Sequence, residues 1–84
     1  MHTSNQIQAG YIILTEGSCK PPYRIAVKPE LISAIEAHSG WSGCSSQVYV
    51  QGRDARYDTT ETFDEILQLI DEYNKQHKAN SNYE

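Results

Sequence analysis

Apolar and polar positions along the chain predict short strands over its first two thirds. Residues 11–15 are rich in aromatic and β-branched side chains, which is typical of a strand. Residues 23–28 alternate, so that Tyr23, Ile25 and Val27 share one face. The loop between the two segments holds two consecutive prolines, which cannot join a β-ladder. The two segments are therefore predicted to form a hairpin.

Residues 29–38 fit two structures. Pro29 suits the first position of a helix. Leu31, Ile32 and Ile35 would then share one helical face. Alternatively, a single turn at the proline leads into a strand that begins at Ile32, and this is the structure that we favour.

The next segments predict a loop and a second hairpin. Residues 39–46 are rich in glycine and serine, which is typical of a loop. Residues 47–51 and 56–59 read as strands, and residues 52–55 read as the turn between them.

A helix is predicted from Thr62 onward. Thr62 and Glu65 match a capping box, in which each side chain accepts a hydrogen bond from the other residue's backbone amide. Apolar residues then recur at spacings of three and four and form one stripe. These residues are Phe63, Ile66, Leu67, Ile70 and Tyr73.

Together the elements predict an α+β fold, a small antiparallel β-sheet of four to five strands packed against one C-terminal amphipathic helix. We expect a single domain over residues 9–78, a disordered N-terminal arm over residues 1–8 and a frayed tail over residues 79–84. The expected core joins Phe63, Ile66, Ile70 and Tyr73 of the helix to Ile13, Ile25, Val27 and Val48 of the sheet.

The opposite face of the sheet is then expected to be unusually apolar. Its predicted residues include Tyr11, Ile12, Leu14 and Tyr49. Exposed apolar patches mark interaction surfaces, so this pattern predicts self-association into a homo-oligomer.

Length and charge exclude several classes of protein. The chain has 84 residues, with 7 Lys+Arg, 11 Asp+Glu and a net charge of −4. This length allows one domain. The longest apolar run, residues 11–14, is far shorter than the roughly 18 residues of a membrane-spanning helix. The basic residues are too few for non-specific nucleic-acid binding, so neither a membrane nor a nucleic acid is expected as a partner.

The N-terminal residues carry neither a basic start nor an apolar core, so we expect no secretory signal and a cytoplasmic location. In that compartment Cys19 and Cys44 are expected to stay reduced. Both lie in predicted loops, so a bridge between them is an open alternative.

Chemistry-bearing residues do not form a recognisable catalytic or metal-binding pattern. His38 and Cys44 are six residues apart, but no residue nearby would orient them as a base and its nucleophile. The other histidines and cysteine stand singly, without the paired spacings of a zinc site. We therefore expect no enzyme activity, no cofactor and no metal.

Two groups of residues are candidates for binding. Trp41 in the Gly/Ser loop is a candidate anchor for a partner or a flat ligand. With Arg53, Arg56 and Arg24 it could hold a partner or an anionic small molecule such as a nucleotide. The second group would be an acidic surface that engages a basic partner protein. It consists of Glu61, Asp64, Asp71 and Glu72.

Residues 12–73 resemble the small FlbD-like proteins of flagellar operons. The matching positions are Ile13-Leu14-Thr15, Val27, Pro29, Leu31-Ile32, Ile35, Gly52, Tyr57 and Thr62-Phe63-Asp64-Glu65-Ile66. Lys28 stands where the family prefers Asn, and the loop over residues 38–46 is longer. The resemblance implies this fold and a non-enzymatic binding or regulatory role, with no catalytic residues to carry over.

The sequence thus predicts a small non-enzymatic module that binds another protein or itself. The alternative is a phage-encoded anti-defence protein that inhibits a host immune complex or sequesters an anionic nucleotide signal. An acidic single domain of this size fits both.

Overall fold

The computed structural model describes residues 6–37 and 43–81. These residues form an antiparallel sheet and one C-terminal α-helix, which confirms the α+β fold. The elements are β1 (Ile7–Gln8), β2 (Tyr11–Glu16), β3 (Tyr23–Val27), the 3-10 helix η1 (Pro29–Leu31), β4 (Ile32–Ala37), β5 (Ser46–Val50), β6 (Tyr57–Thr59) and α1 (Phe63–Ser81).

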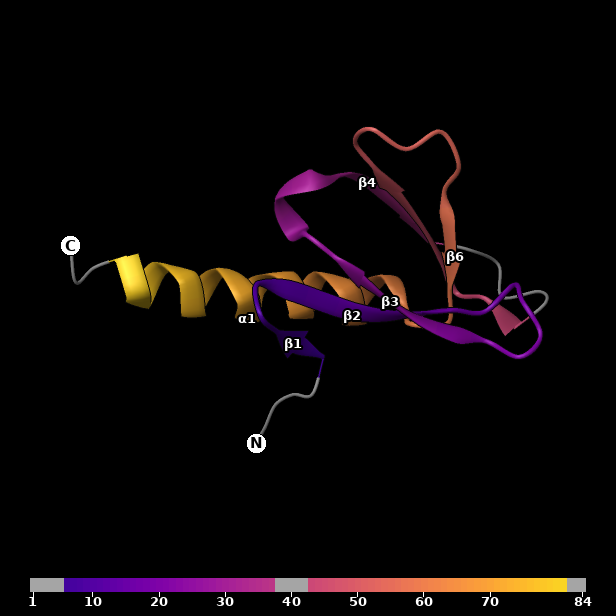
Figure 1. The fold of residues 1–84 in the computed structure, drawn as a ribbon. Helices are drawn as coiled ribbons and strands as arrows, with labels where there is room; N and C mark the ends of the chain where they lie inside the picture. Colours follow the sequence, from indigo (N-terminus) through magenta and orange to yellow (C-terminus); the bar gives the residue numbers. More distant parts are fainter. Residues whose placement is uncertain (1–5, 38–42, 82–84) are drawn as a thin grey trace.

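The strands of the described residues form a six-stranded sheet in the order β1-β2-β6-β5-β4, with β3 on the other side of β2. The expected hairpin of β2 and β3 is confirmed, and Ile12 faces Val27 across it. The β2 strand is shared by the two halves of the sheet, because its last residue, Glu16, pairs with Thr59 of β6. In Figure 1, β4 and β6 rise above β2 and β3, and α1 overlaps β2 and β3 in this view.

The chain ends differ from the expected disordered arm and frayed tail. Ile7 pairs with Ile12, and the Ile13 amide donates to the Gln6 carbonyl at 2.7 Å, so this part of the arm is strand β1. A two-residue strand is too short for a sequence pattern to reveal. The helix α1 continues to Ser81, and residues 1–5 and 82–84 lie outside the described residues.

The turn followed by a strand is confirmed after Pro29. The η1 turn ends where the Ile32 amide bonds to the Pro29 carbonyl, and Ile32 itself is already extended. Strand β4 follows immediately and pairs antiparallel with β5. The helical alternative for this segment is therefore wrong.

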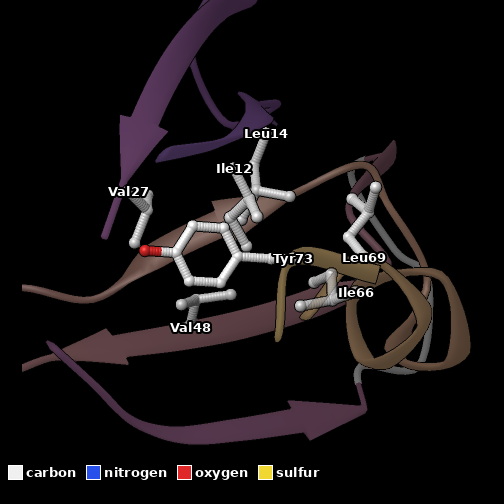
Figure 2. Packing of buried hydrophobic residues seen from close by; sticks show 7 residues of the cluster. All are labelled: Ile12, Leu14, Val27, Val48, Ile66, Leu69 and Tyr73. Atoms are coloured by element: carbon white, nitrogen blue, oxygen red, sulfur yellow. The ribbon is translucent and has the colours of Figure 1, made fainter. Parts of the chain in front are cut away.

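The core lies between the helix and the sheet, and its register on β2 corrects the sequence-based expectation. Ile12 and Leu14 are fully buried, whereas Ile13 is only half-buried on the opposite face. The expected apolar outer face of β2 is therefore wrong at these two positions. The buried cluster, drawn in Figure 2, consists of Ile12, Leu14, Val27, Val48, Ile66, Leu69 and Tyr73.

The helix begins as the capping box predicts. The Thr62 amide donates to Glu65 Oε1 at 2.9 Å, and the Glu65 amide donates to Thr62 Oγ1 at 3.1 Å. Ile66 and Tyr73 are buried as expected, and Leu69, which the predicted stripe omits, is buried with them. Phe63, Leu67 and Ile70 line a groove, and Ile70 also packs against the buried cluster, as expected.

Tyr73 connects the helix to the η1 turn through a buried hydroxyl. Its side chain is 2% exposed, and the hydroxyl donates to Glu30 Oε2 at 2.6 Å. Burial raises the pKa of Tyr73 to about 12, and the hydrogen bond and charge of Glu30 act in the same direction.

This raised pKa predicts a loss of stability in alkali. The unfolded chain ionises Tyr73 near its ordinary pKa of 10.0, whereas the folded chain holds the proton until about pH 12. The stabilising effect is therefore complete below pH 10 and is lost as the pH rises from 10 to 12. Urea unfolding between pH 9 and 12 measures it. The variant Tyr73→Phe should show a shallower decline in that range, and an identical decline would contradict the assignment.

Candidate protein-binding groove

An apolar groove of about 340 Å³ lies between strand β4 and helix α1. The strand contributes its consecutive residues Ile32–Ile35, so the backbone of β4 forms one wall. The helix forms the other wall with Phe63, Leu67 and Ile70, and Pro29 closes one end. The helix buries one stripe of side chains against the core, and the neighbouring stripe lines the groove beside β4.

The wall formed by β4 is an edge of the sheet. Among the described strands β4 pairs with β5 alone, so its other side has no strand beside it. A register shift between Ile32 and Ala34 marks a bulge at Ser33, whose Oγ donates to the Tyr49 carbonyl at 3.3 Å. The regular part of the edge is therefore Ala34–Ala37.

Large apolar side chains stand exposed at or beside the groove. Leu67, on the helix wall, is 44% exposed. Leu31 is 39% exposed in the turn that leads into β4 but does not line the groove. An exposed leucine leaves apolar surface in contact with water. A partner that covered this surface would gain roughly 25 cal/mol of binding free energy per Å² buried.

The four residues of the expected acidic surface do not share one face. Asp64 and Asp71 lie three residues before and four residues after Leu67, which places both beside it on the helix surface. Glu72 lies on another side of the helix, where it accepts a hydrogen bond from Gln68 at 3.5 Å. Asp64 and Asp71 therefore form an acidic rim along the helix wall of the groove.

Glu61 belongs to the sheet and not to the acidic rim. Its carboxylate accepts the Thr15 amide at 2.9 Å, the Thr15 hydroxyl at 3.0 Å and the Gln6 side-chain amide at 3.3 Å. Glu61 thereby provides an acceptor for a β2 amide that lies between the part of β2 paired with β1 and the part paired with β6. Glu61 also lines a second depression of about 370 Å³, with Arg24 and Ile13 among its other residues.

The expected basic group is divided as well. The Arg53 guanidinium lies over the Tyr57 ring, with 4.1 Å from Cζ to the ring centroid. Arg56 pairs with Asp58, with 3.1 Å from Nε to Oδ1. Because Tyr57 and Asp58 are neighbours on β6, their side chains point to opposite faces of the sheet. The two arginines therefore do not converge on one ligand, and Arg24 is in the second depression.

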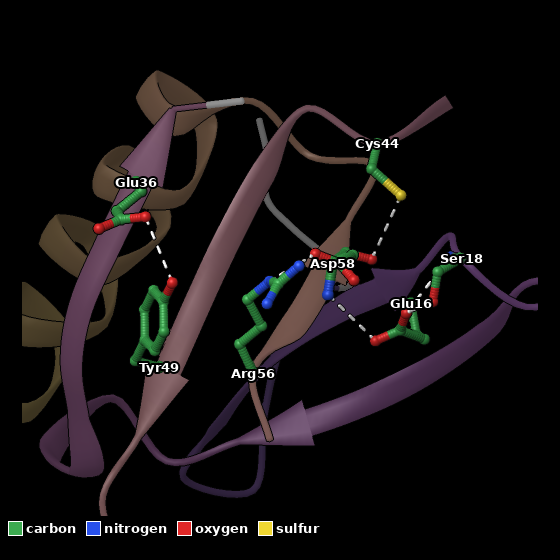
Figure 3. Close-up of polar contacts among 7 residues, drawn as sticks. All are labelled: Glu16, Ser18, Glu36, Cys44, Tyr49, Arg56 and Asp58. Atoms are coloured by element: carbon green, nitrogen blue, oxygen red, sulfur yellow. Dashed lines mark hydrogen bonds and ion pairs between the residues drawn. The ribbon is translucent and has the colours of Figure 1, made fainter. Parts of the chain in front are cut away.

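Arg56 is part of a polar ladder on the outer face of β4, β5 and β6 (Figure 3). Glu36, Gln47 and Asp58 face one another across the three strands. The Tyr49 hydroxyl donates to Glu36 at 3.3 Å. When its oxygen faces Arg56, the Gln47 amide accepts from Arg56 Nε at 2.9 Å and donates to Glu36 at 3.1 Å. The guanidinium of Arg56 is therefore already paired with Asp58 and Gln47 on this face.

A buried polar cluster joins the end of β2 to β6. Glu16, 5% exposed, accepts the Asp58 amide and the Ser18 amide, both at 3.2 Å, and also the Ser18 hydroxyl (Figure 3). Cys44 is 2% exposed, and its thiol donates to the Asp58 carbonyl at 3.7 Å. Burial, with the nearby charges of Asp58 and Glu16, raises the pKa of the Cys44 thiol. A thiol in this state is a poor nucleophile at neutral pH.

The remaining expected residues are either outside the described parts of the chain or form no second site within them. Trp41 and His38 lie outside the described residues. Cys19 is exposed and Cys44 is buried, and both are free. Within residues 6–37 and 43–81, His, Cys, Asp and Glu form no group of three that could hold a metal ion. The helix described here is not apolar enough over a sufficient length to cross a membrane.

Comparison with known proteins identified no relative. No family model matches the chain, and neither the curated proteins nor the solved structures contain a significant match.

Proposed function

We propose that the protein is a small non-enzymatic module that binds another protein through the groove between β4 and α1. The observation that supports this proposal is the coincidence of three features at one place. An open strand edge, an apolar groove of about 340 Å³ and the exposed Leu67 adjoin one another there. Each is a recognised element of protein-binding surfaces.

A non-catalytic role is consistent with the state of the reactive side chains. The raised pKa of the Cys44 thiol keeps it protonated at neutral pH, and its proton is directed to a backbone carbonyl. The acidic side chain beside it, Glu16, is occupied by backbone and serine donors. Such a cluster serves the fold by pairing polar groups that would otherwise be buried alone.

The binding of an anionic ligand has less support. That role required Arg53 and Arg56 to act together, but one stacks on Tyr57 and the other pairs with Asp58 on the opposite face. Self-association through the outer face of β2 also has less support, because Ile12 and Leu14 are in the core and only Tyr11 of the expected β2 residues is exposed. A regulatory role of the kind that the FlbD-like resemblance implies is compatible with the proposed groove.

The proposal predicts that a photoreactive benzoylphenylalanine at position 67 captures a protein in the cells that express this chain. The same group at position 76 is the matched control. Gln76 is exposed and lies nine residues, or two and a half turns, after Leu67, on the opposite side of the helix. Adducts are measured by gel shift and mass spectrometry.

We expect an adduct at position 67 and none at position 76. An adduct of twice the chain mass would identify a second copy as the partner and would still support binding by the groove. Equal labelling at both positions, or none at position 67, would contradict the proposal.

A further inference from the structure

We propose that the occupant of the groove is an extended segment of another protein, with apolar and basic residues in alternation, which adds to the sheet as a strand beside β4. This inference rests on the proposed function and names the chemistry of the partner. Three observations lead to it: the state of the outer strands of the sheet, the apolar side chains in the groove and the charge of its rim.

Three described strands have a single partner strand, namely β1, β3 and β4. Strand β1 has only two residues, and the two longer ones, β3 and β4, differ in their protection. Strand β3 follows Pro21 and Pro22 and carries Arg24 as its second residue, and prolines and charges of this kind discourage strand addition. Strand β4 has the sequence Ile-Ser-Ala-Ile-Glu-Ala and contains no Pro, Lys or Arg. Its backbone therefore offers donors and acceptors to an added strand, in the mode known as β-augmentation.

An added strand would have one face toward the helix and the other toward solvent, because side chains alternate along it. The inward face would meet Leu67 and Ile70, which requires apolar side chains. The outward face would lie beside Ala34 and Glu36, two exposed residues of β4 that pair with Tyr49 and Gln47 of β5. Glu36 is a carboxylate there, so basic residues suit the outward face of the strand.

The rim adds to this charge preference. Asp64 and Asp71 border the helix wall, and Glu36 lies on the outer face of β4, beyond the strand wall of the groove. Lys75 approaches Asp71 at 3.3 Å, but both side chains are largely exposed, and such a pair contributes little. Long basic side chains on the added strand could therefore lie near Glu36 or near the acidic rim of Asp64 and Asp71.

The same charges disfavour a second copy as the occupant. Two copies joined through their β4 edges by a twofold axis would bring the acids of both rims to one interface. Like charges placed opposite one another in a sheet are destabilising. A basic segment would be attracted to the acidic rim, whereas a second copy would be repelled by it.

The test uses a defined eight-residue peptide of alternating Lys and Val, acetylated and amidated, with the full-length chain. Binding is measured by NMR titration of the backbone amides at low and high salt. We expect shifts at residues 32–37 and 63–71 and an affinity that falls with salt. The corresponding Glu/Val and Lys/Ser peptides should bind at least about tenfold more weakly, because they lack the charge and the apolar face respectively.

Two N-methylated peptides test strand addition itself. One is methylated at every Val nitrogen and the other at every Lys nitrogen. The amides of a strand point alternately to its two sides, so only one of these sets can face β4. We expect one methylated peptide to lose at least about tenfold in affinity and the other to bind like the parent, since a tenfold loss corresponds to about 1.4 kcal/mol. Equal effects of the two would overturn strand addition.

Leu67→Asp separates groove binding from general attraction between opposite charges. This variant makes the chain more acidic, so general attraction would strengthen binding of the Lys/Val peptide, whereas loss of the groove wall should weaken it. Gln76→Asp adds the same charge on the opposite side of the helix and should leave binding unchanged. Tighter binding by Leu67→Asp would overturn the inference.

The outcomes distinguish this inference from the proposed function. Capture of a protein at position 67, combined with failure of the Lys/Val peptide to bind, would overturn only the chemistry of the occupant. Absence of capture at position 67 would overturn the proposed function itself.

Discussion

Leu14→Ala is expected to lower the free energy of unfolding by about 3 kcal/mol, whereas Ile13→Ala should lower it by less than about 1 kcal/mol. Leu14 is fully buried in the cluster around Tyr73, so removal of its side chain loses apolar burial and leaves a cavity. Ile13 is half-buried on the other face, at the floor of the depression beside Glu61. Neighbouring residues on one strand thus provide a matched pair.

Urea unfolding monitored by circular dichroism measures both variants. A loss of about 3 kcal/mol is a large share of the stability of a small domain, which is typically about 5–15 kcal/mol. The Ile13→Ala variant also controls for any loss of strand propensity on β2. Equal losses in the two variants, or a larger loss for Ile13→Ala, would contradict the register of β2 described here.

The register of β2 shows what the sequence alone cannot decide. Residues 11–14 are all apolar, so their pattern has no alternation that could assign one face to the core. The structure settles the assignment through pairing, because Ile12 faces Val27 and Leu14 faces Ile25 across the hairpin. In β3, by contrast, Arg24 interrupts the apolar residues, and the inward side of that strand is predictable from sequence.

For helix α1, the sequence predicts the helix itself but not which of its sides lines the candidate site. Its capping box is a local feature of Thr62 and Glu65, and the sequence predicts it correctly. The stripe of apolar residues correctly indicates a helix, but it cannot separate the side that packs on the core from the side that lines the groove. That division depends on how the sheet lies against the helix, which requires pairing between distant segments such as β2 and β6. For the same reason the sequence could list acidic residues but could not show that Asp64 and Asp71 lie beside the groove while Glu61 does not.

Gly17→Ala is expected to lower the free energy of unfolding by about 2 kcal/mol. Gly17 is buried where the chain leaves β2, and its amide donates to the Asp58 carbonyl at 2.8 Å. A Cβ atom at this position would lie 2.6 Å from Thr60 Cγ2 and 3.3 Å from Cys44 Sγ. The first distance is well inside van der Waals contact, so the junction of β2 with β6 must shift or Thr60 must change its rotamer.

A double-mutant cycle with Thr60→Ser isolates the clash, because serine keeps the hydroxyl and removes the methyl group that the new Cβ would meet. We expect Thr60→Ser alone to change stability little and to restore most of the loss when combined with Gly17→Ala. Gly52→Ala is a useful contrast. Gly52 has φ +82° but nothing within 4 Å of the added Cβ, so Thr60→Ser should not rescue its strain. Additive losses for Gly17→Ala and Thr60→Ser would show that the cost at Gly17 comes from the backbone, and would contradict a close approach between β2 and β6 at this point.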